Sequence, residues 1–536
     1  MVNMFSSSWL RPSHAFHAVW LILNGIIFWN TYRLYKGQPQ YYYLHQILGS
    51  GLCISRGTGA VLNVSCGLIL LPTCKRAATT LRRYCCRLLG RCGLSARFIR
   101  LFFNQAERFH ITCAFTVIIA SVIHTGAHLV NAVNCSLYYN HRWIEVNIAE
   151  SPGQDPLQLV FFTLPGITGV LMMLILTMIL VTSASWFRTR HFNTFYYSHH
   201  FLFGPFLVLL VFHPTSGMLK EQTNWRDHWP GNDDQDGPPP VFIPMKGYTW
   251  LYVTIPIIFY LFDWSWRKVS RRQPVSVSRV VVHEPDVIEL VVDRWMSHSQ
   301  PGQYVFLQCP VISGFQWHPF SLSSCCDMTH ASWTVHMKTR GDWCKQLKSL
   351  LGKTQRDDVE LYVDGPFSSP FSDVINSRTV ICIAGGIGFT PFLCVIHNLI
   401  RNGWNARPER LHIVFCVQKA ESLLWASAAI DQLIEDAWAS PRPDKLEIRL
   451  HVTRPAPAAC RGFSPVEIIL SQKYPNLLRR LEYGRPKWKE LFTSWKETYS
   501  RERVDVFSCG PRELNRQIEQ MCRSISNFTL AYESFS

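Results

Sequence analysis

Hydrophobic residues form six long stretches in the first half of the chain. The stretches lie at about 13–32, 44–72, 111–134, 156–187, 191–219 and 247–262. A run of about 20 apolar residues is long enough to cross the hydrocarbon core of a bilayer. Although 44–72 contains Arg56 and the last stretch is short, the pattern predicts six transmembrane helices.

From about Pro274 the pattern changes to short apolar runs, many of them rich in Val and Ile, as β-strands are. The first of these runs predict a small antiparallel barrel, with strands within Val275–Val292 and at Tyr304–Gln308, Trp333–Lys338 and Val359–Val363.

From Ser377 onward, short apolar strands alternate with longer helical stretches, which predicts a parallel sheet with crossover helices. The predicted strands include Thr379–Ile383, Leu411–Val417, Leu446–Val452 and Val504–Phe507. We therefore expect three domains: six membrane spans at 1–270, a β-barrel at 271–375 and an α/β domain at 376–536.

The chain carries a net charge of +16, and its basic residues cluster between the apolar stretches. Lys75–Arg108 holds nine Lys or Arg against one acid, and further basic blocks are Arg188/Arg190 and Arg267–Arg272. The positive-inside rule places such loops in the cytosol, and with six spans both termini lie there too. This position of the charge argues against nucleic acid as a partner. We expect an integral protein of the endoplasmic reticulum or the plasma membrane.

The cysteines and one sequon add little to this picture. None of the 18 cysteines forms a Cys-x-x-Cys pair, and most lie in predicted membrane or cytosolic segments, so we expect no disulfide framework. Asn134-Cys135-Ser136 is a glycosylation sequon at the predicted external end of the third stretch.

Four histidines occupy matched positions in two of the apolar stretches. His110 and His124 are 14 residues apart, and so are His199 and His213. Because this is almost four helical turns, the two imidazoles of each helix face the same side, about 21 Å apart along the axis. Both helices run the same way across the bilayer, so His110 lies level with His199 and His124 with His213. Ionisable residues inside a membrane are usually functional, and these predict two bis-histidine sites for b-type heme.

Other interpretations of these histidines are a polar bridge between helices or a proton path. The inner ligand on the second helix is ambiguous as well, because His200 follows His199 directly. Gly204-Pro205 lies between them and His213, and a proline can accompany a π-bulge that leaves the downstream register intact. We favour His199.

Two further polar residues are expected near the outer histidine pair. Arg56 either extends to the membrane surface as a structural residue or pairs with a heme propionate and attracts oxygen or superoxide. His128 lies one turn beyond His124 and either belongs to the oxygen-reducing pocket or caps the helix. The sequence does not choose between the two interpretations of His128.

A candidate flavin motif, His318-Pro319-Phe320-Ser321, follows a predicted strand and the segment Pro301-Gly302-Gln303-Tyr304. Motifs of this kind place backbone amides and a hydroxyl against a flavin and its ribityl chain. Lys338, in His336-Met337-Lys338, is expected to neutralise the FAD pyrophosphate, and the alternative is an ordinary exposed strand lysine.

Candidate nucleotide motifs follow the predicted strands of the last domain. Gly385-Gly386-Ile387-Gly388-Phe389-Thr390-Pro391 comes after one strand and opens a helix, where glycines and the helix N-terminus accommodate phosphate. It differs from the Gly-x-Gly-x-x-Gly fingerprint and is similar to the variant in ferredoxin-reductase-like modules. Arg485 suits bidentate contact with the 2′-phosphate of NADPH. Cys509 ends a strand where a nicotinamide ring would lie.

With these residues in place, the chain resembles the NADPH oxidases over nearly its whole length. The resemblance implies a six-helix, ferric-reductase-type domain with two hemes, followed by a ferredoxin-reductase-like module with FAD and NADPH lobes. It implies heme ligation by His110, His124, His199 and His213, flavin binding at His318–Ser321, and NADPH binding at Gly385–Pro391, Arg485 and Cys509. Phe535 resembles the family's terminal aromatic residue, which stacks on the flavin and moves to admit nicotinamide.

Four segments resemble the constitutively active type four members of the family: Tyr43–Gly49, Leu52–Arg56, Leu68–Pro72 and Glu533–Ser536. This likeness implies release of mainly hydrogen peroxide and a small membrane partner, the cytochrome b light chain. It also implies a role in peroxide release for His228, in the outer loop between the fifth and sixth stretches.

Two departures from the type four pattern bear on these expectations. The outer loop is short and has no cysteine, whereas the vertebrate members have a longer loop with cysteines. Gln418 stands where the family usually has an arginine beside the adenosine phosphate, and Lys419 is expected to take over that contact.

Together these observations predict an enzyme that passes electrons from cytosolic NADPH through FAD and two hemes to molecular oxygen, producing hydrogen peroxide, superoxide or both. The alternative is a transmembrane ferric-chelate reductase of the same architecture, which differs in its terminal acceptor. A voltage-sensing or proton channel would show an arginine-repeat helix, and a signalling scaffold would not need intact flavin and nucleotide motifs.

Overall fold

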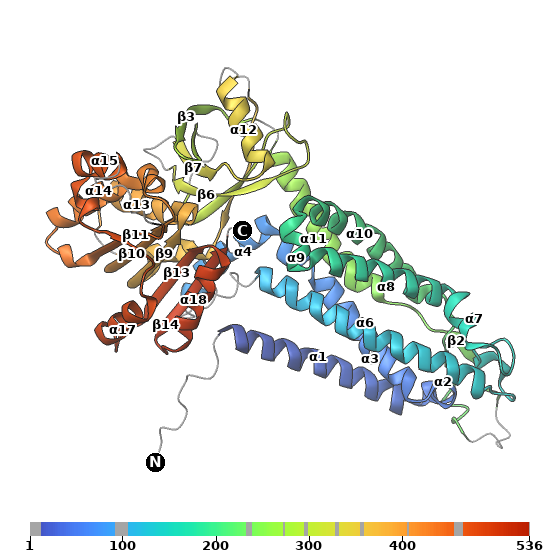
Figure 1. Ribbon diagram of the computed structural model, residues 1–536. Helices are drawn as coiled ribbons and strands as arrows, with labels where there is room; N and C mark the ends of the chain where they lie inside the picture. The colour runs from blue at the N-terminus through green and yellow to red at the C-terminus, as the bar shows by residue number, and fades with distance from the viewer. Residues whose placement is uncertain are drawn as a thin grey trace, which may run out of the picture. The chain divides into compact units, whose positions relative to one another are not determined.

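The structure is a computed structural model in which the chain divides into two compact units (Figure 1). It describes residues 12–91, 106–231, 238–271, 274–293, 299–326, 332–353, 359–404, 407–454 and 465–534. The first unit is Met1–Ala78 with Gln105–Trp264, and the second is Thr79–Asn104 with Ser265–Ser536. The domain boundaries expected from the sequence, at 270/271 and 375/376, stay predictions.

The first unit is built of helices, and two helices, α4 and α11, continue from it into the second unit. The helices are α1 (Pro12–Gly37), α2 (Tyr42–Leu48), α3 (Ser50–Leu68), α4 (Lys75–Arg91), α6 (Ala106–Leu137), α7 (Pro156–Phe161), α8 (Leu164–Ser183), α9 (Ser185–Arg190), α10 (Phe192–Phe212) and α11 (Thr249–Ser270). A short antiparallel pair, β1 (Lys220–Gln222) and β2 (Phe242–Pro244), completes the unit.

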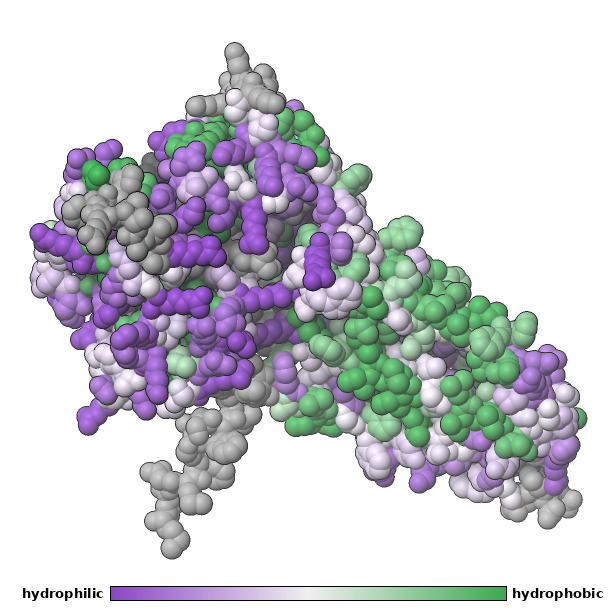
Figure 2. All heavy atoms as spheres, viewed as in Figure 1, coloured by the Kyte–Doolittle hydropathy of each residue, from purple (hydrophilic) through white to green (hydrophobic). Residues whose placement is uncertain are grey.

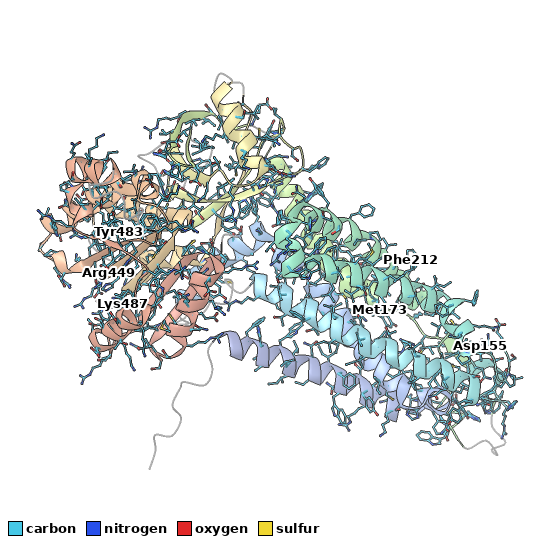
Figure 3. The ribbon with its side chains drawn as sticks, viewed as in Figure 1. Asp155, Met173, Phe212, Arg449, Tyr483 and Lys487 are labelled. Atoms are coloured by element: carbon cyan, nitrogen blue, oxygen red, sulfur yellow. The ribbon has the colours of Figure 1, made fainter. Side chains whose placement is uncertain are left out.

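Four segments among the described residues are long and apolar enough to cross a membrane: Ser50–Thr73, Arg108–Leu137, Leu164–Ser183 and Phe192–Thr215. Their outward faces carry large apolar side chains. Leu174, Phe201 and Phe212 are 58%, 77% and 57% exposed, and apolar surface covers α8 and α10 in Figure 2. Phe212 and Met173 are labelled on these two helices in Figure 3. An apolar outer surface of this kind fits a lipid environment.

Two of the predicted spans are interrupted in the structure. The 44–72 stretch consists of α2 and α3, joined at Gly49, whose φ of +61° favours glycine. The 156–187 stretch is divided among α7, α8 and α9. Asp155, labelled in Figure 3, caps α7 by accepting a hydrogen bond from the Leu157 amide, and Thr163 caps α8 in the same way. Capping residues therefore start new helices within an apolar run.

The second unit contains a six-stranded antiparallel sheet in the order β3-β4-β7-β6-β5-β8. The strands are β3 (Val277–His283), β4 (Val287–Asp293), β5 (Gln303–Gln308), β6 (His318–Ser324), β7 (Ser332–Lys338) and β8 (Tyr362–Ser368). A bridge between Val275 and Leu361 joins the segments that precede the two edge strands. Trp333, Leu290 and Leu307 are fully buried in the core of this sheet, which α12 (Asp342–Lys353) also covers.

The second sheet of this unit is parallel, with the strand order β12-β11-β10-β9-β13-β14. The strands are β9 (Thr379–Gly385), β10 (Arg410–Val417), β11 (Leu446–Val452), β12 (Leu481–Tyr483), β13 (Val504–Gly510) and β14 (Phe528–Ser534). Helices α13 (Thr390–Asn402) and α14 (Leu424–Ala439) pack on one face, and α17 (Trp488–Thr498) and α18 (Arg512–Arg523) on the other. This is the predicted α/β arrangement, in which ligands bind at the carboxyl ends of the strands.

Candidate functional site

The four membrane histidines lie in two pairs: His110 and His124 are on α6, His199 is on α10, and His213 directly follows α10. The ring centres of His110 and His199 are 6.3 Å apart, with their planes at 56°. The ring centres of His124 and His213 are also 6.3 Å apart, at 58°. The matched spacing predicted from the sequence is therefore present, and each ring of one helix faces a ring of the other.

Each of these imidazoles is held at its Nδ1 atom by a neighbouring helix. On α6, Nδ1 of His110 lies 2.9 Å from the Ile69 carbonyl oxygen, and Nδ1 of His124 lies 2.9 Å from that of Ser55. A carbonyl only accepts, so both Nδ1 atoms carry the proton. Both anchors belong to α3 or the residue that follows it. The Nε2 atoms of both rings are thus left as lone-pair donors.

The two histidines of the second helix are anchored by hydroxyl groups of α8. Oγ1 of Thr168 lies 2.9 Å from Nδ1 of His213 and donates its own proton to the Leu164 carbonyl, at 2.6 Å. The imidazole must therefore donate, which again leaves Nε2 unprotonated. Oγ of Ser183 lies 3.3 Å from Nδ1 of His199. Metal-ligating histidines are usually oriented in this way through their second nitrogen.

The spacing of the rings fits a metal ion between them. An ion about 2 Å from each Nε2, which itself lies about 1.1 Å from its ring centre, needs ring centres about 6 Å apart. The measured separation is 6.3 Å in both pairs. Together with the Nδ1 protons of His110, His124 and His213, this spacing fits one heme between the rings of each pair.

His200 has a different environment from His199. Its Nδ1 lies 2.7 Å from the Tyr196 carbonyl oxygen of its own helix, and the residue is exposed. The helix runs through Pro205 without a π-helical turn, so the 14-residue spacing stays regular. The histidine that faces His110 is therefore His199.

Arg56 and His128 both lie beside the outer pair. The His128 ring contacts the His124 ring edge-on, with centres 4.6 Å apart. Arg56 follows Ser55 on α3, and its guanidinium contacts the Tyr35 ring at 5.5 Å and the Met245 sulfur at 3.6 Å. The Arg56 Nε is buried and has no hydrogen-bond partner among the described residues, so it can still bind an acidic group.

His228 lies apart from these histidines, in a buried position beside Tyr43. The Tyr43 hydroxyl is 3.1 Å from its Nε2, and the Gln222 side chain donates to its backbone carbonyl at 2.8 Å. Only 4% of His228 is exposed. The outer loop therefore holds this histidine in one defined orientation.

The flavin motif follows β5 along the chain and is itself part of a strand, β6. Its residues pair with β5, with Ser321 opposite Tyr304 and Phe320 opposite Val305. The His318 ring stacks on Trp343 with centres 4.5 Å apart, and burial lowers the pKa of this imidazole. Pro319 pairs with Phe306. Lys338, at the end of β7, forms an ion pair with Asp286 at 3.0 Å and is partly exposed.

The glycine motif lies against the end of β13, which explains why glycines are needed there. A Cβ atom on Gly388 would lie 2.3 Å from the Cys509 carbonyl oxygen, and one on Gly385 would lie 2.8 Å from the Pro511 side chain. Gly386 has a φ of +57°. Cys509 is buried, which raises the pKa of its thiol, and its register partner on β14 is Glu533. The motif and Cys509 thus meet at one edge of the sheet.

The remaining nucleotide candidates lie at the same edge of the sheet. Lys419 follows β10, and Arg485 follows β12 just after Tyr483, which is labelled in Figure 3 with Arg449 and Lys487. Both Lys419 and Arg485 are exposed. Thr390 and Pro391 begin α13, where the Thr390 hydroxyl donates to the Ile387 carbonyl at 3.1 Å. Phe535 lies outside the described residues.

Comparison with known proteins assigns the chain to a family. Three family models match it: "Ferric reductase like transmembrane component" at 57–211, "FAD-binding domain" at 272–371 and "Ferric reductase NAD binding domain" at 377–523. NADPH oxidase 4 of Homo sapiens is 32% identical over 98% of this chain and 98% of that protein. The chain belongs to the NADPH oxidase family.

More distant proteins share less with this NADPH oxidase. NADPH oxidase 1 of Mus musculus is 27% identical, over 98% of this chain and 93% of that protein. Ferredoxin-NADP+ reductase from Plasmodium falciparum is 13% identical, with a TM-score of 0.32 over 48% of this chain and 95% of that one.

Membership of the family defines the general activity. The chain is a transmembrane oxidoreductase that uses NADPH, with FAD- and NAD-binding domains in its second half. The ferric-reductase match spans the helices that carry His110, His124 and His199 and ends two residues before His213. In this family that domain carries hemes.

Sequence reasoning missed two features of the NADPH oxidase. The Nδ1 anchors are backbone carbonyls and hydroxyls of α3 and α8, which no motif indicates. A cluster of His283, Glu289 and His336 in the antiparallel sheet was missed as well, although His336 stands two residues before Lys338. Burial is the main reason that the pKa of His336 falls to about 3.

Proposed function

We propose that this NADPH oxidase moves electrons from cytosolic NADPH to molecular oxygen across the membrane, producing hydrogen peroxide and superoxide, with hydrogen peroxide as the main product. The observation that carries the proposal is the pair of facing imidazole couples at 6.3 Å, each ring with a fixed orientation. The resemblance to the type four members favours peroxide as the main product, and NADPH oxidase 4 of Homo sapiens is 32% identical to this chain.

His110 and His199 would hold the inner heme, and His124 and His213 the outer one. The hemes and FAD, when bound, supply carriers that turn hydride oxidation into single-electron transfer. The 14-residue spacing along α6 separates the two pairs of ligands by about 21 Å. Carbonyl groups of α3 and hydroxyl groups of α8 keep the Nε2 lone pairs pointing between the helices. Histidines anchored in this way would keep the ligand atoms of both sites in place.

Oxygen would be reduced at the edge of the outer site, because His124 and His213 would both be engaged in holding the heme. Arg56 lies beside this site with a buried, unpartnered Nε among the described residues. Its positive charge would pair with a propionate and attract oxygen or superoxide. His128 lies against His124 and would border the same pocket. His228, fixed by Tyr43, would supply a proton for dismutation.

The second unit would bind the two nucleotides. His318, Pro319, Phe320 and Ser321 would contact the flavin, and Lys338 would exchange Asp286 for the FAD pyrophosphate. The NADPH phosphates would bind at the glycine motif, to Gly385, Gly386, Gly388, Thr390 and Pro391. Lys419 and Arg485 would contact the 2′-phosphate. Cys509 would lie beside the nicotinamide, and Phe535 would stack on the flavin. Guanidinium groups suit such phosphates because they can bind through two nitrogens.

In the membrane, we propose six spans rather than four. α1 and α11 are 26 and 22 residues long, which suffices to cross a bilayer. With the basic segments in the cytosol, both termini would lie there, in the endoplasmic reticulum or the plasma membrane. The partner would be a small membrane subunit of the cytochrome b light chain type.

A spectrum and a product assay test this proposal. Membranes from expressing cells should show b-type heme bands in a reduced-minus-oxidised spectrum, and His110→Leu and His124→Leu should each remove about half of that signal. Purified protein with NADPH should form peroxide faster than it reduces an iron chelate. The reverse preference would favour a ferric-chelate reductase, the activity in the printed names of two matching family models. Unchanged heme content in both variants would overturn the ligand assignment.

A further inference from the structure

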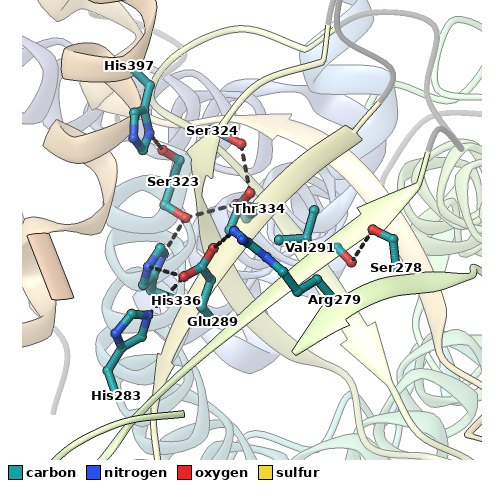
Figure 4. Close-up of polar contacts among 10 residues, drawn as sticks. All are labelled: Ser278, Arg279, His283, Glu289, Val291, Ser323, Ser324, Thr334, His336 and His397. Atoms are coloured by element: carbon teal, nitrogen blue, oxygen red, sulfur yellow. Dashed lines mark hydrogen bonds and ion pairs between the residues drawn. The ribbon is translucent and has the colours of Figure 1, made fainter. Parts of the chain in front are cut away.

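The antiparallel sheet carries a second group of metal-ligating side chains, the His-Glu-His cluster, made of His283, Glu289 and His336 (Figure 4). Glu289 on β4 and His336 on β7 are register partners, and His283 ends the neighbouring strand β3. One ligand atom of each residue lies within 4.8 Å of the other two. Three adjacent strands therefore hold two imidazoles and a carboxylate together.

Hydrogen bonding fixes the protonation of His336 in this cluster. The Ser323 hydroxyl donates to the Thr334 carbonyl at 3.0 Å, so it has no proton left for the imidazole. Nδ1 of His336, at 2.7 Å from that hydroxyl, must therefore donate to it. In this buried, neutral ring the Nε2 atom is then a lone pair, and it makes no hydrogen bond to a described residue.

The lone pair on Nε2 of His336 faces a second hydrogen-bond acceptor, the Glu289 carboxylate. Nε2 of His336 lies 3.7 Å from Oε2 of Glu289, so two electron-rich atoms face each other across the cluster. Nε2 of His283 lies 2.8 Å from the same carboxylate oxygen. A separation of 3.7 Å is too long for a direct hydrogen bond between the two atoms. A cation between the three atoms would resolve the conflict.

The distances suit a tetrahedral ion of the zinc type. Two ligand atoms at about 2.0–2.1 Å from such an ion lie about 3.3 Å apart, between the two measured values. The other carboxylate oxygen, Oε1, accepts from Arg279 at 3.0 Å, as ligating carboxylates commonly do from a neighbouring side chain. The Arg279 side chain is 62% exposed, so water screens its charge.

We propose that His283, Glu289 and His336 bind one divalent transition-metal ion of the zinc class, with solvent as the fourth ligand. The ion would link strands β3, β4 and β7. It would also fix the His336 ring, which packs on Trp425 of α14 with centres 5.0 Å apart. None of the three ligands is among the proposed heme or nucleotide ligands, and all three belong to the antiparallel sheet.

The test uses the full-length protein in detergent, stripped with EDTA, loaded with zinc chloride and passed through a desalting column. Zinc per chain is measured by mass spectrometry in wild type, His336→Gln and His283→Gln. A matched control is His451→Gln, because His451 and Glu482 form a similar cross-strand pair at 3.8 Å in the parallel sheet. Flavin content per chain shows whether each variant is folded, and His283→Gln decides the test if His336→Gln loses flavin.

We expect wild type and His451→Gln to retain one zinc ion more per chain than the two cluster variants. X-ray absorption at the zinc edge should show two imidazole nitrogens and oxygen ligands at about 2.0–2.1 Å. Equal zinc content in all four proteins, or an equal loss in His451→Gln, would mean an adventitious ion only. Sulfur ligands at about 2.3 Å would place the ion on cysteines and overturn the proposal as well.

Discussion

The ring centre of His213 lies 6.3 Å from that of His124, the same separation as in the pair formed by His110 and His199. The equality follows from the 14-residue spacing on both helices, which repeats one lateral contact almost four turns further along. Because both pairs have the same ring separation, the effect of a substitution in one pair can be compared with that of the matching substitution in the other.

The neighbouring residues His199 and His200 provide a sharp test of the inner pair. We expect His199→Leu to lose one of two hemes, which lowers the reduced-minus-oxidised absorbance by about half and abolishes oxygen reduction. His200→Leu should keep both hemes, because the His200 ring is exposed and bonds to the Tyr196 carbonyl of its own helix. The two difference spectra check this directly. Loss of heme in the His200 variant with retention in the His199 variant would reverse the assignment.

The Thr168 hydroxyl should control how tightly the outer heme is held. Thr168→Val keeps the shape of the side chain but removes the oxygen that accepts from Nδ1 of His213. Loss of such an orienting contact typically weakens metal binding about 10- to 100-fold. The rate of heme loss to an excess of a heme-scavenging protein measures the effect. Thr177→Val is the control, because Thr177 lies on the same helix and bonds only to the Met173 carbonyl. Equal rates in the two variants would contradict the role of Thr168.

Gly388→Ala should disable the nucleotide site without affecting the helices. A Cβ atom there would lie 2.3 Å from the carbonyl oxygen of Cys509, so the end of β13 or the glycine motif would have to move. We expect NADPH oxidation to fall about tenfold or more, since small displacements at a reacting centre can cost about 100-fold. Dithionite should still give the full heme spectrum. Gly352→Ala is the control, because no atom of the described residues lies within 4 Å of the corresponding Cβ position. Normal NADPH kinetics in Gly388→Ala would contradict this close approach.

His318 should make the stability of the second unit depend on pH. Burial lowers its pKa below the value of 6.5 expected for an unfolded chain, so the folded state prefers the neutral ring. Its contribution to stability is present above pH 6.5 and is lost as the pH falls from there through the folded-state pKa. We expect the difference in melting temperature between wild type and His318→Gln to shrink between pH 7.5 and pH 5.5. If the difference in melting temperature between the two proteins is the same at pH 7.5 and pH 5.5, His318 is exposed to water in the folded state.

The periodicity of the sequence predicted those features that depend on a single helix or strand. The histidine spacing predicted facing rings because a helix has a fixed rise and twist. The apolar runs Thr379–Ile383 and Leu411–Val417 predicted β9 and β10 because buried parallel strands are continuous in hydrophobicity. β12 was missed because it has three residues, two of them exposed.

Features that depend on contacts between distant segments could not be predicted in this way. The Ser55 and Ile69 carbonyls that orient His124 and His110 are backbone atoms, so no residue type indicates them. The burial of Cys135, which lies in the last turn of α6 within the sequon, was not indicated by the sequence either. The His-Glu-His cluster brings together β3, β4 and β7, and its pairing register is decided by the fold of the whole sheet.

Because the four imidazoles are anchored by other helices, heme can bind only when these helices are packed correctly. Each pair of rings comes from α6 and from α10 or the residue that follows it. Their Nδ1 anchors come from α8 and from α3 or the residue that follows it. If any one of these four helices were misplaced, the Nε2 atoms would no longer have the orientation that heme iron requires. Binding to the native arrangement alone stabilises that arrangement by mass action. Correctly packed chains would therefore retain heme, and misfolded chains would release it.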